Sequence, residues 1–489
     1  MAGTRTTESR ARAAGDATPW LAIAALATAG LVARGLLAYV NPWPTVDGAG
    51  YIMQARELVR SGQLPYSTFP PGWPLVIAAP LALRGLDDPY APLRAAQGAN
   101  VLLGALLPWL AWLLVRRDLG RGRALAIAAL LTFLPQSLIL AKGDLSEMSY
   151  GCALLGAGLL LAARRPLATG LLLGYAYLIR PEALVVAAAL SAALLWRERR
   201  PPWRLWVGLA LPVIPYVAFI HARTGAWGLS GKSVFLARAW ATHPGWGMAG
   251  LYGRNAATFL AMLAGLVGLP IGLLAVAGAI RGPRGWLLWL TPLALLPLFD
   301  FAMAPRYWVP YLPFVLWGAG HGARGLLAFA RGRLQRAGRA AAARAAAPLL
   351  AALALAGLGL AARDDARWVV PNTETYFGLR DGGLWLRERV GRDAVVADYK
   401  PFLPYWADCR HLACPPGRTA AEIVAAARAA GADFLIVNVA EVRHHVPALD
   451  PLLAVPPPAP LTDALVVVNV LTYPDDPQQN TVIYQIRRP

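Results

Sequence analysis

The sequence predicts an α-helical polytopic membrane protein of about 11 transmembrane helices that ends in an extracytoplasmic α/β domain. Of its 489 residues, 57% are hydrophobic and only 15% are charged, whereas soluble domains contain about 25% charged residues. Long apolar runs recur up to residue 362, and the loops between them are short and rich in arginine. Residues 363–489 are less apolar and alternate strand and helix patterns, which predicts a soluble α/β domain.

The net charge of +19 comes from arginine clusters in the short loops. Basic loops are typical of the cytoplasmic side of a membrane protein, so the charge indicates a lipid bilayer and no nucleic-acid partner. The first apolar run, 20–40, is long enough to span, which argues against a cleaved signal peptide. We therefore expect a multi-pass protein of the bacterial plasma (inner) membrane, part of the cell envelope, whose residues 1–18 form a cytoplasmic tail.

Each further span in the transmembrane domain, 19–362, is an apolar run bounded by polar residues. Residues 41–92 form external loop one, in which the run 75–83 is too short to cross. With the N-terminus inside, a count of eleven spans puts every basic cluster inside and the domain 363–489 outside. This orientation requires that a break at Arg180-Pro181-Glu182 divides 167–196 into two spans. The predicted spans are 20–40, 93–115, 124–141, 148–163, 167–179, 183–196, 205–222, 255–280, 286–302, 307–322 and 346–362.

External loop one carries the stretch around which the chain is organised, 47–74. The apolar residues of 51–59 recur at helical spacing with Arg56 and Arg60 in the polar positions, which predicts a short helix along the membrane surface, apolar side down. A proline cluster ends it, because proline lacks the amide hydrogen. A carboxylate at the start of such a loop suits chemistry at the bilayer surface, although Asp47 could simply cap the helix.

Ionisable side chains gather at the predicted external ends of the spans, where a charge in a membrane protein needs a reason. Each alone is explained by snorkelling or by helix capping. Together they suit a reaction that needs a base and a clamp for an anion, and a lipid-linked phosphate would lie at this height. These residues are Asp47, Lys142, Asp144, Glu147, Arg180, Glu182, Lys232 and Arg306.

The C-terminal domain has its own local signals. Thr419 and Glu422 form a capping box that starts an alanine-rich helix ending at Gly431. Cys409 and Cys414 could form a disulfide outside the cell, and their spacing does not make a zinc site. Strands are expected at 393–399, 434–439, 464–470 and 481–486.

Four motifs, taken in order, resemble those of GT-C integral-membrane glycosyltransferases. They are Asp47-x3-Tyr51 with the later Pro-Pro-Gly-Trp-Pro, Ser146-Glu147 after the third span, the Leu178-to-Glu182 turn, and Arg306-Tyr307 before two prolines. The group that looks closest contains protein O-mannosyltransferases, aminoarabinose transferases and bacterial lipopolysaccharide glycosyltransferases. The resemblance covers about residues 20–320 and implies a GT-C-like fold.

The resemblance implies transfer of a sugar from a polyprenyl-phosphate-linked donor to an acceptor hydroxyl on the extracytoplasmic face. In that family the first-loop aspartate is the catalytic base, so Asp47 would take the hydroxyl proton, and a single displacement would invert the anomeric centre. The acceptor would be a glycan, a lipid or a protein. The resemblance further implies that Tyr51, Asp144 and Glu147 orient acceptor or sugar, and that Arg306, Lys232 and Arg180 bind the donor phosphate.

One departure from the family bears on this expectation. Many relatives have Asp followed directly by Glu, whereas Gly48 follows Asp47 here. Either Glu147 or Asp144 supplies a second carboxylate, or the acceptor binds differently, or activity is lost. With one carboxylate in loop one, we expect no metal site and no cofactor.

Two other classes of protein remain open at this point. A transporter or lipid flippase would usually show repeated halves and charges near the membrane midplane, but no internal repeat is visible and the charges lie at the outer face. A non-catalytic scaffold that kept the GT-C fold is the third reading. The sequence identifies neither the sugar nor the acceptor.

Overall fold

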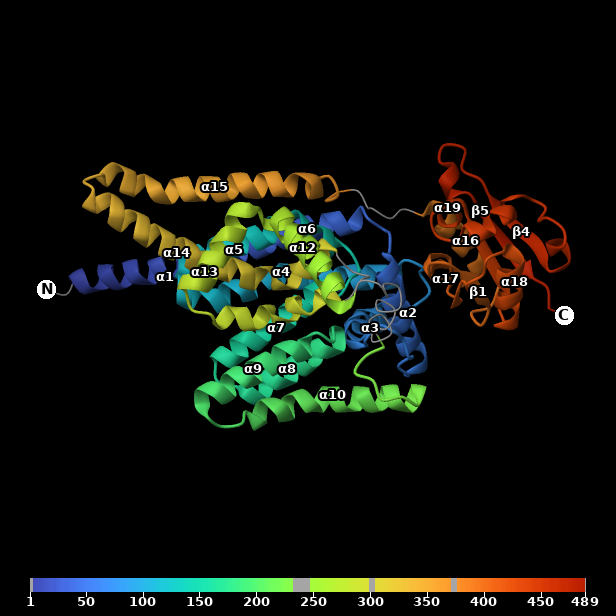
Figure 1. Cartoon of the computed structure of the whole chain (residues 1–489), viewed down its shortest axis with the longest axis horizontal. Helices are drawn as coiled ribbons and strands as arrows, with labels where there is room; N and C mark the ends of the chain where they lie inside the picture. Colours follow the sequence, from blue (N-terminus) through green and yellow to red (C-terminus); the bar gives the residue numbers. More distant parts are fainter. Residues whose placement is uncertain (1–2, 232–246, 299–303, 371–375, 489) are drawn as a thin grey trace. The chain divides into compact units, whose positions relative to one another are not determined.

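The computed structural model describes residues 3–231, 247–298, 304–370 and 376–488 (Figure 1). Its contacts divide the chain into two compact units. The membrane unit comprises Met1–Pro42, Ser61–Pro80 and Ala95–Asn372. The second unit comprises Trp43–Arg60, Leu81–Arg94 and Thr373–Pro489. This division differs from the domains expected from the sequence, because 43–60 and 81–94 of external loop one pack with the C-terminal residues.

The membrane unit consists of helices. Its long helices are α1 (Gly3–Tyr39), α4 (Ala91–Leu119), α10 (Trp203–Thr224), α12 (Gly247–Val267), α14 (Leu312–Arg336) and α15 (Ala340–Ala366). Shorter helices are α3 (Gly72–Arg84), α5 (Arg121–Phe133), α6 (Pro135–Lys142), α7 (Glu147–Ala162), α8 (Pro166–Ile179), α9 (Ala183–Glu198) and α13 (Leu269–Arg281). Three 3-10 helices, η1 (Gly285–Ala294), η2 (Leu296–Leu298) and η3 (Pro305–Tyr311), lie between α13 and α14.

Several helices are long and apolar enough to cross a bilayer, which confirms a polytopic membrane fold. Within the described residues, length and composition select four spans and two bent helix pairs, which raise the number to six if each pair is one span. The pairs are α5 with α6, bent by 54°, and α12 with α13, bent by 112°. The predicted count of about 11 spans stays a prediction, because the remaining apolar helices are short.

Two segments have a local structure that the sequence did not predict. The cytoplasmic tail 1–18 is helical from Gly3 onwards, because its alanines and arginines favour helix. The predicted span 286–302 is a pair of 3-10 helices over its described part, 286–298. Pro292 and Pro297 each lack the amide hydrogen of a regular α-helical ladder, which explains the tighter winding.

The break at Arg180-Pro181-Glu182 is confirmed, because α8 ends at Ile179 and α9 begins at Ala183. On its other side α8 packs tightly against α10. A Cβ atom at Gly170 would lie 2.0 Å from the Leu205 carbonyl oxygen, and one at Gly208 would lie 2.1 Å from the Leu167 carbonyl oxygen. The two backbones therefore touch at glycines, which is a common mode of helix packing in membranes.

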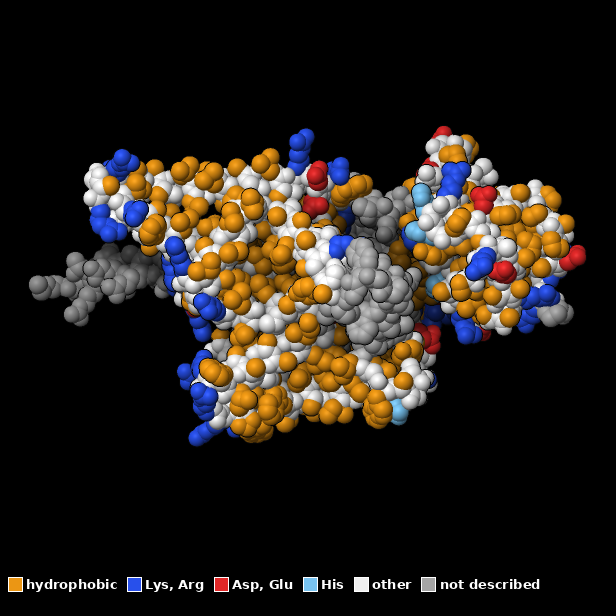
Figure 2. All heavy atoms as spheres, in the orientation of Figure 1, with side chains coloured by type: hydrophobic (Ala, Val, Ile, Leu, Met, Phe, Trp, Pro, Cys, Tyr) orange, Lys and Arg blue, Asp and Glu red, His pale blue; other side chains and the backbone are white. Residues whose placement is uncertain are grey.

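The basic side chains of the membrane unit are concentrated at one end. Figure 2 shows the Lys and Arg side chains (blue) gathered around the turns that join α9 to α10 and α14 to α15, while apolar side chains cover the helix sides. These turns belong to the loops that the sequence predicts to be cytoplasmic. The distribution is the one expected for basic loops on one face of a bilayer.

The second unit contains a five-stranded sheet of order β2-β1-β3-β5-β4. Strand β1 is parallel to β2 and β3, and β5 is antiparallel to β3 and β4. The strands are β1 (Val395–Asp398), β2 (Arg410–Ala413), β3 (Phe434–Asn438), β4 (Leu465–Leu471) and β5 (Thr481–Ile486). The helices are α2 (Val46–Ser61), α16 (Phe377–Arg387), α17 (Phe402–Ala407), α18 (Ala420–Ala429) and α19 (Val439–His444). Short 3-10 turns are η4 (Pro447–Leu453), η5 (Leu461–Asp463) and η6 (Pro477–Gln479).

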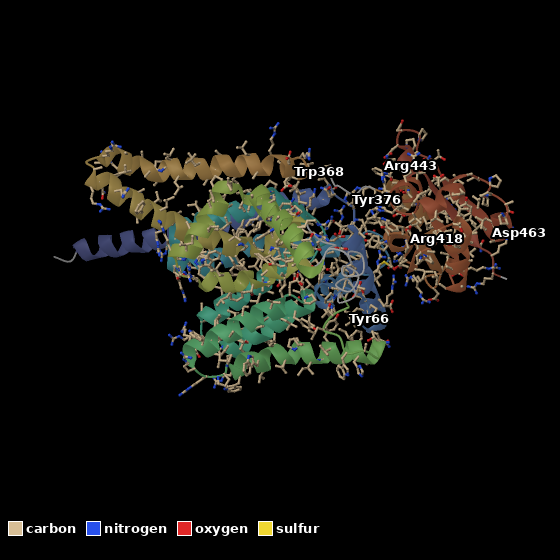
Figure 3. All side chains as sticks on the ribbon, viewed as in Figure 1. Tyr66, Trp368, Tyr376, Arg418, Arg443 and Asp463 are labelled. Atoms are coloured by element: carbon tan, nitrogen blue, oxygen red, sulfur yellow. The ribbon has the colours of Figure 1, made fainter. Side chains whose placement is uncertain are left out.

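The sheet has a hydrophobic core on each face. Leu435 and Val437 of β3 pack with Ile423 of α18 on one face, while Ile436 packs with Leu379 of α16 on the other. This alternation follows the two-residue period of a strand. Exposed polar residues, including those labelled in Figure 3 as Arg418, Arg443 and Asp463, surround the layers. The α/β class and the four predicted strands are confirmed, and β2 is an addition.

Local predictions in this unit have two outcomes. The capping box is confirmed, because Thr419 Oγ1 accepts from the Glu422 amide at 3.2 Å. Cys409 and Cys414 are free thiols. They flank strand β2, whose extended backbone separates residues five apart by roughly 16 Å, and a disulfide needs Cα atoms within about 7 Å.

Two buried carboxyl groups lie at the carboxyl edge of the parallel strands. Asp398 ends β1 and Glu441 lies in α19, and they are 1% and 4% exposed. Burial and the neighbouring Glu441 carboxyl raise the pKa of Asp398 well above its usual range, and burial raises the pKa of Glu441 to about 7. The two carboxyl groups therefore lose their protons at a higher pH than isolated carboxyl groups do. Nearby, Lys400 Nζ donates to the hydroxyl of Tyr376 at 2.9 Å.

Candidate functional site

Helix α2 of the second unit carries the first two predicted site residues. Thr45 is its N-cap, because Thr45 Oγ1 accepts from the Gly48 amide at 3.0 Å and the Thr45 carbonyl accepts from Ala49 at 2.8 Å. Asp47 lies in the first turn and is partly exposed, where the helix dipole favours a carboxylate. Tyr51, one turn later, is 3% exposed. The Thr45 hydroxyl, two residues before Asp47, therefore caps the helix.

Two residues on the polar side of α2 are also buried, although Glu57 is exposed, which corrects the expectation of an amphipathic helix lying apolar side down on a membrane surface. Arg56 is 3% exposed and Gln54 is 6% exposed. The Arg56 guanidinium donates to the Tyr405 carbonyl at 2.6 Å and lies 4.4 Å from the centroid of the Tyr405 ring. Burial lowers the pKa of Arg56, and the nearby Tyr405 and Asp408 oppose that change.

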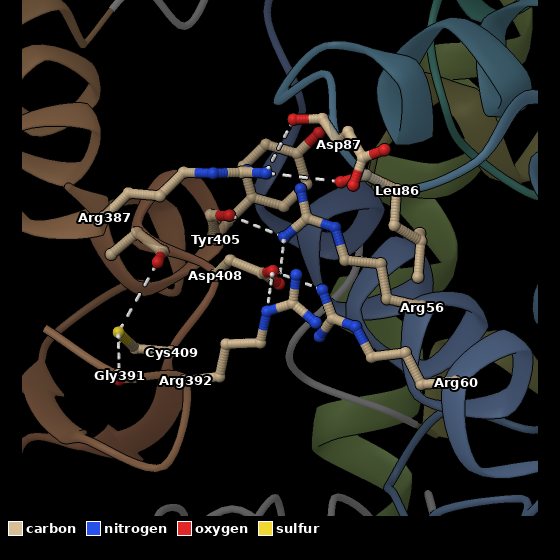
Figure 4. Close-up of polar contacts among 11 residues, drawn as sticks. Arg56, Arg60, Leu86, Asp87, Arg387, Gly391, Arg392, Tyr405, Asp408 and Cys409 are labelled. Carbon is tan, nitrogen blue, oxygen red and sulfur yellow. Dashed lines mark hydrogen bonds and ion pairs between the residues drawn. The ribbon is translucent and has the colours of Figure 1, made fainter.

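The Asp408 carboxylate forms ion pairs with three arginines (Figure 4). Its carboxylate lies 3.4 Å from Arg56 Nη1 and 3.4 Å from Arg392 Nε, and it also accepts from Arg60. Asp408 is itself in the left-handed region, with φ of 58°, which aspartate tolerates better than most residues. The cluster fastens the helix that carries Asp47 to the sheet domain, within one compact unit.

A second attachment of the same kind holds residues 81–94 in this unit. Arg387 of α16 donates to the carbonyls of Leu86 and Asp87 at 3.2 and 3.0 Å (Figure 4). Tyr90 packs edge-on against Trp406, with ring centroids 4.9 Å apart. Both flanks of external loop one are therefore part of the sheet domain.

In the membrane unit, the Pro-Pro-Gly-Trp-Pro elbow organises two other segments. Trp73 is fully buried, and its indole Nε1 donates to the Asp144 carbonyl at 2.7 Å. A Cβ atom at Gly72 would lie 2.6 Å from the Leu178 carbonyl carbon, so only glycine lets the elbow touch the end of α8. The tryptophan and the glycine thus fix the loop before α7 and the turn after α8.

The loop before α7 has a further anchor that the sequence reasoning missed. Asn100 of α4 donates to the carbonyls of Gly143 and Leu145 at 3.1 and 2.7 Å, and it is fully buried. Its only sequence signal is a polar amide in an apolar span. The anchored loop leads directly into Glu147 at the first turn of α7.

Glu147, Arg180 and Arg306 come together in a buried ionic cluster. Glu147 Oε1 lies 3.1 Å from Arg180 Nη1 and 3.9 Å from Arg306 Nε. Arg180 Nε also contacts Glu182 at 2.6 Å. The Arg180 side chain is 5% exposed, whereas that of Arg306 is 28% exposed. Because two carboxylates flank Arg180, Arg306 is the better placed of the two to meet an incoming anion.

Three tyrosines enclose this cluster. Arg180 Cζ lies 4.7 Å from the ring centroid of Tyr307 and 5.8 Å from that of Tyr150. The hydroxyls of Tyr150 and Tyr311 are 3.1 Å apart and buried. Tyr150 follows Glu147 by three residues, so it shares a helix face with it, and that spacing could have identified it from the sequence.

The other predicted residues have separate positions. Asp144 is fully buried in the loop that leads into Glu147. The Lys142 amine donates to the carbonyls of Trp368, Val369 and Val370 at 3.0, 2.7 and 3.3 Å, which is a structural role at the end of α15. Lys232 lies outside the described residues.

No metal-binding cluster is found in the part of the chain that the structure describes: no three His, Cys, Asp or Glu side chains are placed to hold an ion. In the membrane unit, Glu147 Oε2 is buried and has no hydrogen-bond partner among the described residues. A buried carboxylate oxygen of this kind can accept a hydrogen bond from a hydroxyl group. The cluster therefore offers one acceptor and one partly exposed cation.

Comparison with solved structures defines the class of the fold. A structure of ArnT from Cupriavidus metallidurans bound to undecaprenyl phosphate matches with a TM-score of 0.60 at 16% identity, over 96% of this chain and 98% of that chain. The Archaeoglobus fulgidus oligosaccharyltransferase in complex with Zn and sulfate matches with a TM-score of 0.60 at 13% identity, over 94% of this chain and 73% of that chain.

A further structure has the same fold. AglB from Archaeoglobus fulgidus, in complex with an inhibitory peptide and a dolichol-phosphate, matches with a TM-score of 0.55 at 12% identity, over 86% of this chain and 70% of that chain. ArnT and AglB are both GT-C glycosyltransferases, so the predicted GT-C fold is confirmed. No protein-family model matches the sequence, and no curated protein matches it.

Proposed function

We propose that this protein is a membrane glycosyltransferase that moves a sugar from a polyprenyl-phosphate-linked donor to an acceptor hydroxyl. The observation that carries the proposal is the match over 96% of the chain to the fold of ArnT, which was solved with undecaprenyl phosphate. The ionic cluster of Glu147, Arg180 and Arg306 supports it, because a departing lipid phosphate needs a cation. The reaction takes place on the extracytoplasmic face of a bacterial inner membrane, opposite the basic loops.

In the proposed mechanism Asp47 takes the proton of the acceptor hydroxyl as its oxygen attacks the anomeric carbon. The bond between that carbon and the phosphate oxygen breaks, polyprenyl phosphate leaves, and the configuration inverts. Arg306 neutralises the leaving phosphate, and Arg180 holds Glu147 in place. Glu147, Asp144 and Tyr51 orient the sugar or the acceptor.

The experiment is transfer from a set of radiolabelled polyprenyl-phosphate sugars to native membrane acceptors. Wild type is compared with Asp47→Asn and with Asp87→Asn, which removes an exposed carboxylate from the same external loop. The proposal predicts transfer by wild type and by Asp87→Asn and a loss of at least about 100-fold in Asp47→Asn, since a general base contributes about 10²–10⁴-fold.

Each contrary result has a defined meaning. Equal transfer by wild type and Asp47→Asn would remove Asp47 as the base and leave Glu147 or Asp144 for that role. No transfer from any donor would favour a transporter or a scaffold that kept the fold. Because Gly48 stands where many GT-C relatives have a second carboxylate, the experiment has to exclude a non-catalytic scaffold in particular.

A further inference from the structure

A cavity of about 1090 Å³ lies at the basic end of the membrane unit. It is formed by the ends of α7, α9 and α10 together with η1 and α14. The mechanism proposed above does not use any residue that lines it. Its charged lining residues are Arg164, Arg197, Glu198, Arg200 and Arg204, and its apolar ones include Leu114, Leu161, Leu190, Leu194, Leu288, Trp289 and Trp317.

The cavity lies far from the ionic cluster. Helix α7 begins at Glu147 and ends at Ala162, which lines the cavity. A helix of 16 residues is about 24 Å long. The two sites therefore lie at opposite ends of the same helix, and a ligand in the cavity is not the substrate at Glu147.

The walls of the cavity suit an apolar chain. They consist of leucine side chains and of Trp289, which is 4% exposed and stacks on Phe314. The indole Nε1 of Trp317 is buried and finds no acceptor among the described residues. The wall thus presents one unused hydrogen-bond donor in an otherwise apolar surface.

The mouth of the cavity suits an anion. It has four arginines and only one glutamate. Trp203, which lines the cavity, is 57% exposed, and Trp196, which precedes the lining residue Arg197 in the chain, is 75% exposed. Tryptophans concentrate at the level of lipid headgroups, and basic pockets between membrane helices bind anionic headgroups.

We propose that this cavity binds one anionic phospholipid of the leaflet on the basic side of the protein. The phosphate lies among the arginines of the mouth, and an acyl chain follows the leucines and tryptophans of the wall. The volume of about 1090 Å³ lies just above the roughly 300–1,000 Å³ of small-ligand pockets, which agrees with a ligand that has a long chain. The lipid fastens the ends of α7, α9 and α10 to one another.

The test is native mass spectrometry of the full chain released from vesicles of phosphatidylcholine mixed with phosphatidylglycerol. We expect one retained phosphatidylglycerol on wild type. The double variant Arg197→Gln/Arg204→Gln should lower retention about 30-fold, which corresponds to about 2 kcal/mol at about 1 kcal/mol for each arginine near an anionic lipid. Ala193→Trp fills the cavity without changing the charge and should lower retention as well.

The matched control is Arg331→Gln/Arg339→Gln, which removes the same charge from exposed arginines outside the cavity. It should retain the lipid as wild type does. Equal loss in the control, equal retention of phosphatidylcholine by wild type, or a retained mass corresponding to polyprenyl phosphate would each overturn the proposal. Displacement by inorganic phosphate would also overturn it, because a free anion site does not need the apolar wall.

Discussion

Asp408→Asn should loosen helix α2 from the sheet domain. The substitution removes the carboxylate that lies 3.4 Å from Arg56 Nη1 and leaves that guanidinium, 3% exposed, with no other carboxylate in ion-pair contact among the described residues. Breaking a buried ion pair from one side costs about 3–5 kcal/mol. We expect a value near the lower limit, about 3 kcal/mol, because Arg56 keeps the Tyr405 carbonyl and Arg60 can turn toward water.

The assay is hydrogen exchange of the α2 amides in the full-length protein. About 3 kcal/mol corresponds to exchange roughly 100-fold faster, at 1.36 kcal/mol for each factor of ten. The matched control is Glu388→Gln, which breaks an ion pair with Arg389 whose two side chains are 75% and 49% exposed. Such surface pairs contribute less than about 1 kcal/mol, so exchange should change less than about fivefold.

A double-mutant cycle distinguishes ion pairing from simple loss of packing. Arg56→Met combined with Asp408→Asn removes both charges, so the double variant should cost at least about 1 kcal/mol less than the sum of the single variants. Additive effects would refute the reasoning, because they would mean that Arg56 and Asp408 do not depend on each other. Unchanged exchange in Asp408→Asn would refute it as well.

Two further predictions concern pH and helix packing. Burial raises the pKa of Glu441 to about 7 in the folded state, above its unfolded value, so its contribution to stability is complete below about pH 4 and is lost as the pH rises through 7. The β3 amides should therefore exchange faster at pH 8 than at pH 5 after correction for intrinsic rates. Glu441→Gln should reduce this difference, and the remainder comes from the neighbouring Asp398, whose pKa is also raised. Gly170→Ala should lower the thermal stability in detergent, because its Cβ atom would lie 2.0 Å from the Leu205 carbonyl oxygen. Gly98→Ala, where nothing lies within 4 Å, should be neutral or stabilising by about 0.5–1 kcal/mol; equal destabilisation of both variants would contradict close packing of α8 on α10.

Much of the membrane fold could be predicted from the sequence, because a bilayer imposes local rules. Apolar runs, basic loops and the Arg180-Pro181-Glu182 break are visible in short windows of residues. The ionic cluster was partly predictable for the same reason, since Glu147, Arg180 and Arg306 all follow or precede an apolar run. Which of them pair was not predictable, because that depends on the Trp73 and Asn100 contacts that fix the loop.

The burial of Arg56 could not be predicted. Helix α2 has an amphipathic pattern, and such a pattern indicates which side is apolar, not whether the polar side meets water. Asp408 lies 352 residues away in the chain, and no local pattern connects it with α2. That Cys409 and Cys414 are free thiols could not be predicted either. Strand β2, which separates them, is only four residues long and gives too short a pattern to recognise in the sequence.

The most direct test of the proposed function follows both halves of the donor. Purified protein in vesicles is given a polyprenyl-phosphate sugar with one label on the sugar and another on the phosphate. We predict that the sugar moves to the acceptor with inverted configuration while an equal amount of labelled polyprenyl phosphate is released. Movement of the intact donor across the bilayer, or transfer of sugar and phosphate together, would contradict it.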